Sequence, residues 1–362
     1  MLQKPSIFKR FRLKQASIQY LKRCERHSLQ QLFWECTLRC NLSCLHCGSD
    51  CRTISEKQDM PLVDFINVLD DVRTKMVPDS ILVVTTGGEP LVRRDIFECG
   101  KAIRTRGFHW GMVSNGMLLD EQMCDHLISI GLETIAISLD GFEDEHNWLR
   151  GNSNSFRMAE RAIKTLVCKQ ITWDVITCVN QKNYSQLREF KHYLIDLGVK
   201  YWRIFTIAPI GRATDNDDLQ LDMLQFRDIL DFIVEARKEG MIHLSYGCEG
   251  FLGNYEWKVR DYPFSCQAGI NVASVLADGS ISGCLSIRSE YHQGSIYTDK
   301  FTDVWNKRFD VYRDKKWMRT GQCATCDMWK YCKGNGMHLR DNEGHLLRCH
   351  YKPYAGNVEK DL

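Results

Sequence analysis

Three cysteines of the chain, Cys40, Cys44 and Cys47, stand in a CxxxCxxC spacing that suits metal chemistry. This spacing lets one loop bring three thiolates to a cubane iron–sulfur cluster while one iron keeps no protein ligand. An open coordination position on a metal is typical of a catalytic centre. The same segment is also compatible with buried structural thiols, or with a four-thiolate zinc loop completed by Cys36 or Cys51. The loop is therefore predicted to hold a metal, and iron and zinc both stay open at this point.

Glycines and polar side chains follow other segments that are expected to be buried strands. Residues 86–90 contain Gly87, Gly88 and Glu89. Glycines let a backbone approach a ligand closely, and a carboxylate accepts hydrogen bonds from an ammonium group, although a glycine pair alone predicts only a turn. Ser138 is equally explained as a helix cap and Arg150 as a surface ion pair. The candidates at the later strand ends are Ser114, Asn115, Ser138 and Arg150.

A second group of cysteines lies toward the C-terminus. Cys266 and Cys284 flank a predicted hairpin over 271–284 that turns at residues 278–279. Four thiolates with the spacing of the remaining group also suit a structural zinc ion. That remaining group, a Cx2Cx5C segment and one later cysteine, consists of Cys323, Cys326, Cys332 and Cys349.

These motifs need a scaffold that brings them to one side. Between residues 31 and 240, short β-branched runs alternate with amphipathic stretches of helical period, which predicts βα units on a parallel sheet. The expected strands are 31–37, 81–85, 109–114, 133–139, 172–179 and 201–207, and the expected helices are 61–76, 92–106, 120–130, 155–169, 184–197 and 222–238. Six units are fewer than the eight that close a barrel. The sequence thus predicts an α/β fold, a partial (β/α)6 TIM-like barrel with its chemistry at the carboxyl ends of the strands.

The chain is expected to divide into three parts. Residues 1–30 form a basic N-terminal helical extension, 31–240 form the barrel core, and 241–362 form a small cysteine-rich α+β domain with one helix near 301–314. The extension carries eight Lys or Arg residues against one acid, Glu25. A solvated helix face is the favoured interpretation, over contact with an acidic peptide or a membrane surface.

The composition indicates the cellular compartment and the kinds of partner to expect. Seventeen cysteines are many for a reducing compartment, and the number is odd, which favours metal binding over disulfides. The net charge of +2 gives no reason to expect nucleic acid as a partner. The longest apolar runs are too short to span a bilayer and the N-terminus lacks the apolar core of a signal peptide, so we expect no membrane span and a cytoplasmic location.

The CxxxCxxC loop after the first strand and the GGEP segment after the second together resemble the radical S-adenosylmethionine (SAM) superfamily. The resemblance implies a [4Fe-4S] cluster on Cys40, Cys44 and Cys47 whose open iron binds the amino and carboxylate groups of SAM. One electron, from a flavodoxin- or ferredoxin-type donor, then splits SAM into methionine and a 5′-deoxyadenosyl radical that abstracts hydrogen from a substrate. The resemblance also implies SAM contacts for His46, Gly87, Gly88, Glu89, Ser114, Asn115, Ser138 and Arg150.

The C-terminal cysteines resemble the SPASM extension of that superfamily, with six of its seven cysteine positions matched. The resemblance implies an intact outer auxiliary [4Fe-4S] cluster on Cys323, Cys326, Cys332 and Cys349. The unmatched position is Gly336, which in related enzymes is a ligand of an inner auxiliary cluster. An inner cluster on Cys248, Cys266 and Cys284 is therefore three-ligated with an open iron, completed by another residue such as His338, or absent.

Three functions follow as hypotheses. The first is hydrogen abstraction from a peptide or protein substrate during its maturation, which is common among enzymes of this layout. The second is a small-molecule radical SAM enzyme that modifies haem or tetrapyrrole side chains. The third, from another class, is a non-catalytic iron–sulfur electron-transfer or zinc-structural protein. The GGEP segment and the open three-cysteine loop speak against the third, because neither is needed without SAM.

Overall fold

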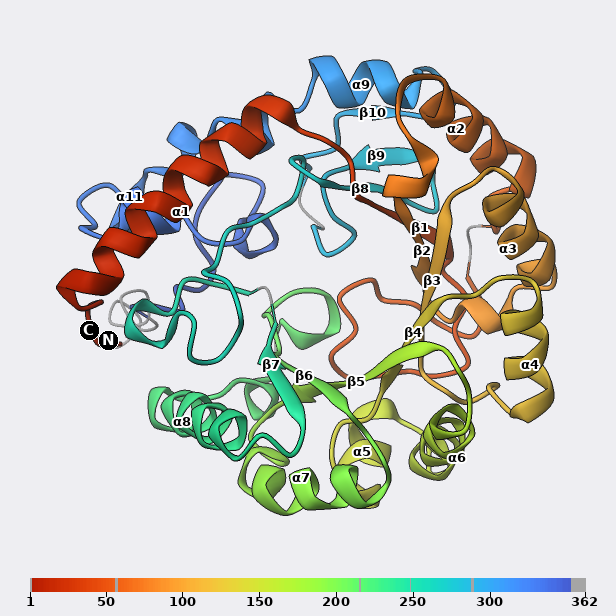
Figure 1. Cartoon of the computed structure of the whole chain (residues 1–362), viewed down its shortest axis with the longest axis horizontal. Coiled ribbons are helices and arrows are strands. Elements are labelled where there is room, and N and C mark those ends of the chain that lie inside the picture. The colour runs from red at the N-terminus through yellow and green to blue at the C-terminus, as the bar shows by residue number, and fades with distance from the viewer. Residues whose placement is uncertain (1, 56–57, 215, 248, 288–289, 353–362) are drawn as a thin grey trace.

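A curved sheet of ten strands forms the centre of the molecule in the computed structural model, which describes residues 2–55, 58–214, 216–247, 249–287 and 290–352. The strand order is β10-β9-β8-β1-β2-β3-β4-β5-β6-β7. Figure 1 shows the helices arranged around the outside of this sheet, which curves as an open barrel. The prediction of an unclosed, parallel-dominated α/β barrel is confirmed.

Strands β1 to β7 run parallel and alternate with helices along the chain. They are β1 (Gln31–Thr37), β2 (Leu82–Gly87), β3 (His109–Ser114), β4 (Thr134–Ser138), β5 (Thr172–Val179), β6 (Tyr201–Thr206) and β7 (His243–Tyr246). The helices that match prediction are α2 (Leu62–Lys75), α3 (Ile96–Thr105), α4 (Glu121–Ser129), α6 (Ser155–Val167), α7 (Leu187–Asp196) and α8 (Met223–Glu239). Local signals start several of them: the Asp120 side chain caps α4, and Asp222 and Gln225 form a capping box at α8.

Two elements of the barrel are absent from the sequence prediction. The short strand β7 pairs with β6, so the parallel sheet has one strand more than expected. Helix α5 (Glu143–Arg150) follows β4. Its first turn contains Glu143, Asp144 and Glu145, and Gly151 ends it in a left-handed conformation with φ 66°. Acidic residues near a helix N-terminus and a glycine just past its C-terminus were the available signals.

The C-terminal hairpin joins the barrel sheet directly. Strands β8 (Val272–Val275) and β9 (Ser280–Ser282) pair antiparallel around the predicted turn, and the short β10 (Gly294–Ser295) pairs with β9. Strand β8 also pairs parallel with β1, with Gln31 opposite Val272. The expected single helix near 301–314 is instead two, α9 (Phe301–Lys307) and α10 (Asp310–Arg313), and α11 (Trp329–Cys332) follows. The cysteine-rich segment therefore continues the sheet of the core.

Large aromatic side chains fix the helices on the sheet. Trp34 of β1 stacks on Phe65 of α2 with ring centroids 4.0 Å apart. Trp110 of β3 lies so close to α3 that a Cβ atom at Gly100 would be 2.3 Å from its ring. Burial of each indole contributes on the order of 4 to 6 kcal/mol before the entropy of ordering is subtracted. This packing holds the strand ends, and so the candidate site, in place.

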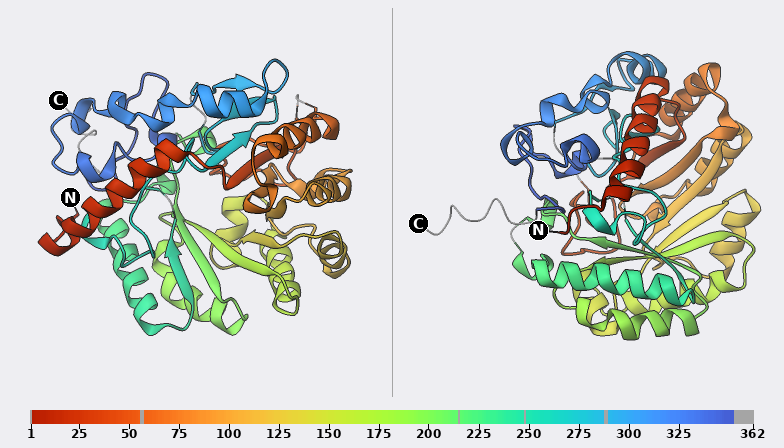
Figure 2. Two further views of the ribbon diagram at one scale, coloured as in Figure 1. Left: turned by 45° about the horizontal axis from the view of Figure 1, so that its top comes forward. Right: turned by 60° about the vertical axis from the view of Figure 1, so that its left-hand side comes forward.

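The N-terminal helix α1 (Ile7–Arg26) lies against the C-terminal segment, as both views of Figure 2 show. Leu13 and Tyr20 of α1 are buried, and Lys9 donates from Nζ to the carbonyl of Glu256 at 2.9 Å. The Arg12 guanidinium lies 4.3 Å from the ring centroid of Trp257. One face of the basic helix is thus solvated as expected, while the opposite face packs on the protein. Within the described part of the chain, no helix combines the length and the apolar character needed to cross a membrane.

Candidate active site

The cysteine loop follows β1 and is closed by backbone contacts. Arg39 and Arg52 form an isolated bridge, and the Cys40 N–H donates to the Arg52 carbonyl at 2.8 Å. Asp59 anchors the start of the loop because it accepts from Thr37 Oγ1 at 2.6 Å and forms an ion pair with Arg39. The loop is therefore shaped by the chain itself.

The three predicted ligands, Cys40, Cys44 and Cys47, lie together in this loop. Cys40 and Cys44 are each 8% exposed, and Cys47 packs against the same small apolar cluster. Asn115 donates from Nδ2 to Cys40 Sγ at 3.8 Å, and Arg150 donates from Nη1 to Cys44 Sγ at 3.7 Å. Donors that reach the sulfur atoms from the end of β3 and from helix α5 fit the surroundings of metal-bound thiolates.

Of the two extra thiols that a zinc loop would use, the structure brings only Cys51 to the cysteine loop. A hydrogen bond from the Cys51 thiol lowers the pKa of Cys47. Cys36 is fully buried elsewhere, close to Arg93 and Cys99, and burial raises its pKa. Thiolates around one zinc ion lie about 3.8 Å apart. Among the described residues no three cysteine sulfur atoms lie within 4.8 Å of one another, so the sulfur spacing is wider than a preformed zinc site has.

Glu89 is buried behind the loop and organises the end of β3. Its Oε1 accepts from Ser114 Oγ at 3.0 Å and from the Leu91 N–H at 3.1 Å, and its Oε2 accepts from the Asn115 N–H at 2.7 Å. Burial raises the pKa of Glu89 to about 7. The structure therefore joins three predicted site residues, Glu89, Ser114 and Asn115, in one hydrogen-bonded group, and it makes Glu89 a positioning residue.

Gly87 and Gly88 let the cysteine loop approach the end of β2. Gly87 has φ +128°, and a Cβ atom there would lie 2.2 Å from the Thr37 carbonyl oxygen. A Cβ atom at Gly88 would lie 2.1 Å from the Arg39 carbonyl oxygen and 3.2 Å from Cys40 Cβ. The sequence predicted that a ligand comes close to these glycines. In the structure, the backbone of the cysteine loop lies there.

A buried ion pair lies on the other side of the cysteines. Arg150 of α5 donates from Nε to Asp140 Oδ2 at 2.6 Å, and Asp140 Oδ1 accepts from the Cys178 N–H at 2.8 Å. Burial would raise the pKa of Asp140, but the charge of Arg150 holds it below its usual value. Arg150 is therefore not a surface residue. Ser138, which ends β4 and is half-buried, lies just before this group.

His46 stands between Cys44 and Cys47 as a neutral ring. Burial lowers its pKa to about 3, and its Nδ1 is buried with no hydrogen-bond partner among the described residues. An uncharged ring with an unused nitrogen beside the third cysteine fits a contact with the adenine of SAM. Arg212 also holds the cysteine loop, because its Nε donates to the Cys44 carbonyl at 2.7 Å.

The four cysteines of the predicted outer cluster converge on one small cavity. The buried Arg340 donates from Nη2 to Cys323 Sγ at 3.5 Å, and the Lys352 N–H donates to Cys349 Sγ at 3.2 Å. No carboxylate of the described residues lines the cavity. This donor set fits metal-bound thiolates. The cysteines that line it are Cys323, Cys326, Cys332 and Cys349.

The predicted inner set is less complete. Cys248 lies outside the described residues, and Cys266 lines a different cavity. Cys284 follows β9. A Cβ atom at Gly336 would lie 2.6 Å from Cε1 of His338, so that ring fills the space of the cysteine that related sequences have. Burial lowers the pKa of His338 to about 4, and Glu249 is the nearest charged group that opposes this shift.

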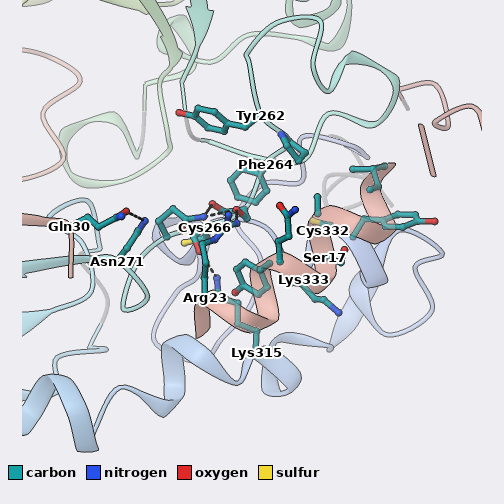
Figure 3. A pocket seen from close by; sticks show the side chains of 18 residues that line it. Ser17, Arg23, Gln30, Tyr262, Phe264, Cys266, Asn271, Lys315, Cys332 and Lys333 are labelled. Atoms are coloured by element: carbon teal, nitrogen blue, oxygen red, sulfur yellow. Dashed lines mark hydrogen bonds between the residues drawn. The ribbon is translucent and has the colours of Figure 1, made fainter. Parts of the chain in front are cut away.

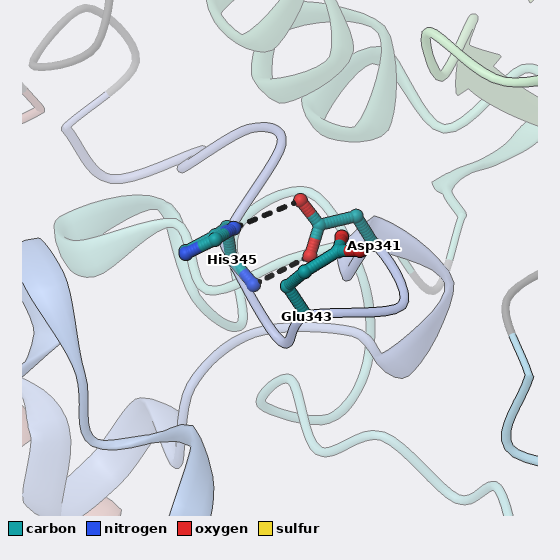
Figure 4. A group of neighbouring side chains, drawn as sticks. All are labelled: Asp341, Glu343 and His345. Carbon is teal, nitrogen blue, oxygen red and sulfur yellow. Dashed lines mark hydrogen bonds and ion pairs between the residues drawn. The ribbon is translucent and has the colours of Figure 1, made fainter.

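A cluster of exposed polar residues near the C-terminus is explained by a turn. Figure 4 shows the side chains of Asp341, Glu343 and His345. Their possible ligand atoms lie within 4.8 Å of one another. Asp341 accepts from the His345 N–H at 2.7 Å and lies 3.1 Å from its Nδ1. These contacts close the turn between Arg340 and Leu346, which form a bridge. The group therefore caps a turn.

One buried polar group gave no signal in the sequence. Glu249 accepts from Tyr246 OH at 2.5 Å and from Thr206 Oγ1, and His350 Nε2 lies 3.5 Å from its carboxylate. Thr206 ends β6 and Tyr246 ends β7, which is the sheet edge that carries the cysteine loop. Thr206, His350 and the neighbouring pair Tyr246 and Glu249 come from three segments that share no spacing motif, so only the fold brings them together.

Comparison with known proteins agrees with this geometry. Residues 34–194 match the sequence model of the radical SAM superfamily, and residues 266–327 match that of the SPASM iron–sulfur cluster-binding domain. The chain is 24% identical over 344 residues to the AdoMet-dependent heme synthase of Methanosarcina barkeri, covering 88% of this chain and 96% of that protein. It is 29% identical over 322 residues to the mycofactocin maturase MftC of Mycolicibacterium smegmatis, covering 84% of this chain and 77% of the other.

Solved structures share the fold. SuiB of Streptococcus suis bound to S-adenosylmethionine superposes with a TM-score of 0.67 at 15% identity, over 88% of this chain and 76% of SuiB. The anSMEcpe structure with bound AdoMet superposes with a TM-score of 0.67 at 18% identity, over 87% of this chain and 91% of the other. The matched sequence models, the shared fold and the loop of three cysteines lead to one assignment. The chain contains a radical SAM domain over residues 34–194 and a SPASM iron–sulfur cluster-binding domain over residues 266–327.

Proposed function

We propose that this radical SAM enzyme abstracts hydrogen from a peptide or protein substrate during its maturation. One observation carries the catalytic part: the cysteine loop, the Glu89 group and the Asp140–Arg150 pair meet at the carboxyl end of one sheet. In a TIM-like barrel this end holds the chemistry. The identity of 29% to a mycofactocin maturase supports a peptide substrate.

Each part of the site has a role in this proposal. Cys40, Cys44 and Cys47 hold a [4Fe-4S] cluster, which when bound with SAM supplies its one-electron cleavage to methionine and a 5′-deoxyadenosyl radical. Asn115 and Arg150 donate toward the ligand sulfurs and hold them in place. The SAM-binding set is His46, Gly87, Gly88, Glu89, Ser114, Asn115, Ser138 and Arg150.

The C-terminal domain handles electrons in the same proposal. Cys323, Cys326, Cys332 and Cys349 hold an outer auxiliary [4Fe-4S] cluster, in line with their shared cavity. A flavodoxin- or ferredoxin-type protein supplies the electron that SAM cleavage consumes. Thiolate-bound clusters of this kind persist in a reducing compartment, which suits the cytoplasm.

A tetrapyrrole side chain is the second candidate substrate. The chain covers 96% of the AdoMet-dependent heme synthase from Methanosarcina barkeri but 77% of the mycofactocin maturase. A match over nearly the whole length of the heme synthase supports a shared layout with that enzyme.

The test is anaerobic reconstitution with iron and sulfide, followed by dithionite and SAM. Formation of 5′-deoxyadenosine is expected, and its absence would contradict both candidates together with the cluster assignment. Deuterated substrates then separate the candidates. Deuterium from a peptide encoded beside the gene is expected in 5′-deoxyadenosine, whereas deuterium arriving only from a tetrapyrrole with carboxylate side chains would select the second candidate.

A further inference from the structure

A cavity of about 530 Å³ lies between part of α1 and the C-terminal segment. We call it the α1 cavity; its walls are α1, the loop of residues 262–267, Asn271, Lys315 and residues 331–333. Figure 3 shows Tyr262 and Phe264 contributed by that loop, and Arg23, Lys315 and Lys333 around the same space. Aromatic rings and cationic heads thus meet around one volume large enough for a small organic molecule.

The charge lining the α1 cavity has one sign. Arg23, Lys315 and Lys333 line it, and no Asp or Glu of the described residues does. Lys315 is only 5% exposed, and its Nζ donates to the Cys266 carbonyl at 3.5 Å. Arg23 donates from Nη2 to Ser265 Oγ at 3.3 Å. Two cationic groups, one from α1 and one from the 3-10 turn Lys315–Met318, therefore reach adjacent residues of one loop.

Neither cation has an acidic partner within the described part of the chain. Lys315 and Arg23 form no ion pair there, although most buried charges in proteins are paired. The neighbour Lys316, which does not line the cavity, pairs with Asp314 at 3.1 Å. A buried ammonium that contacts only a carbonyl and the Tyr20 side chain is costly unless an anion joins it. The cavity is the open space in which such an anion fits.

The α1 cavity is not the SAM site. Gln30 and Asn271 line one end of it, and their side chains form a hydrogen bond of 2.8 Å. They precede β1 and β8, whereas Cys40 follows the opposite end of β1. Seven residues of extended strand span about 20 Å. A ligand in the α1 cavity is therefore held at the other edge of the sheet from the cysteine loop.

We propose that the α1 cavity binds a ligand that carries an oxyanion, a carboxylate or a phosphate, through Lys315 and Arg23. The Lys315 ammonium contacts the anion from the protein interior, and the Arg23 fork contacts it from α1. Tyr262, Phe264 and Tyr331 form apolar walls for the rest of the ligand. This site is independent of the proposed substrate. Cys266, one of the thiols considered for the inner cluster, lines the same cavity.

The test is calorimetric titration of the reconstituted holoenzyme with three probes: inorganic phosphate, citrate and a hexaglutamate peptide. Saturable binding of at least one is expected. Binding of citrate or phosphate identifies a free small anion, and binding of the peptide alone identifies acidic residues of a chain. Arg23→Gln is expected to weaken binding about tenfold and Lys315→Met to abolish it. Arg26→Gln and Lys316→Gln, neighbours that do not line the cavity, are the matched controls and are expected to bind as the wild type does.

Three results would overturn the proposal. The first is no saturable binding of any probe. The second is wild-type affinity in both Arg23→Gln, which lies on the surface and leaves the fold intact, and Lys315→Met. The third is an iron content of about twelve per chain that falls by about four in Cys266→Ala, because the cavity wall would then belong to a third cubane. The expected content is about eight in both proteins.

Discussion

At the scale of single residues, Cys40, Cys44 and Cys47 share one loop, and Asn115 and Arg150 donate to the sulfurs of Cys40 and Cys44. Replacement of any of these three cysteines by alanine is expected to abolish formation of 5′-deoxyadenosine from SAM and to remove about four irons per chain, since three thiolates hold one cubane. Anaerobic SAM-cleavage assays and iron analysis measure both. Cys124→Ala, a buried thiol of α4 far from the loop in sequence, is the control. Wild-type cleavage in a cysteine variant of the loop would refute the assignment.

Glu89 is expected to make SAM binding depend on pH. Burial raises the pKa of its carboxyl to about 7, so the group is ionised above that value and protonated below it. A protonated Glu89 loses acceptor capacity for the Asn115 N–H and the Ser114 hydroxyl, which loosens the end of β3. SAM affinity is therefore expected to fall as pH decreases from about 8 to about 6, the range that brackets this pKa.

Equilibrium binding of SAM to the anaerobic holoenzyme across that range is the measurement. Glu89→Gln keeps the shape of the side chain and cannot titrate, so its affinity is expected to be weaker, by about tenfold, and flat with pH. A wild-type profile without a slope near neutrality would show that Glu89 stays in one protonation state.

The Asp140–Arg150 pair is a stability determinant as well as a site component. Arg150→Met leaves Asp140 buried without its cation and is expected to lower the free energy of unfolding of the apoprotein by about 3 to 5 kcal/mol. The double variant Asp140→Asn with Arg150→Met removes the stranded charge and is expected to recover a large part of that loss. Urea unfolding followed by circular dichroism measures both. An equal loss in the single and double variants would mean that packing, and not charge, dominates.

At the scale of elements, the junction between β2 and the cysteine loop has no spare room. Gly88→Ala places a Cβ atom against the Arg39 carbonyl and is expected to displace the loop, with loss of cluster absorbance and of SAM cleavage. Gly240→Ala is the control, because that glycine follows α8 in open space, and only its left-handed backbone makes alanine cost about 1 kcal/mol. An intact cluster in Gly88→Ala would show that the loop adapts.

The sequence predicted the elements whose signals are local. Strands β3 and β5 have the expected bounds because turns flank both of them, and β5 is also rich in β-branched residues. The hairpin turn at residues 278–279 was readable from its Asp-Gly pair. Strand β7 is four residues long, too short for a periodic signal, and its place is decided by pairing with β6. The pairing of β8 with β1 joins residues about 240 positions apart, which no local pattern encodes.

The candidate site also divides into residues that local sequence signals predict and contacts that only the fold creates. Spacing identified the loop of Cys40, Cys44 and Cys47, and the strand ends identified Glu89 and Arg150. The contacts of each side chain could not be predicted from the sequence. Glu89 accepts hydrogen bonds from Ser114 and Asn115, and Arg150 pairs with Asp140, because of their rotamers and burial in the fold. Glu249 and Lys315 lie outside every motif and were found only through their surroundings.

At the scale of the whole molecule, the core and the cysteine-rich segment share one sheet. A chain cut after residue 240 loses β7, β8 and the hairpin, and the edge of β1 that pairs with β8 becomes exposed. Unpaired strand edges promote aggregation. We expect this fragment to be insoluble or unfolded, and the full chain to unfold in a single thermal transition. Differential scanning calorimetry and size-exclusion chromatography test this, and a folded, monomeric fragment would contradict it.

The β1–β8 pairing also sets an order of events during synthesis. Strand β1 emerges early, but its partner on one side, β8, begins at residue 272. At about 5 to 20 residues per second the ribosome needs on the order of ten to fifty seconds to bridge that interval. Throughout this time one flank of the barrel stays open next to the strand that leads into the three thiols. The edge of β1 beside the strand that leads into the cysteine loop is therefore expected to gain its partner only after the C-terminal third of the chain has been synthesised.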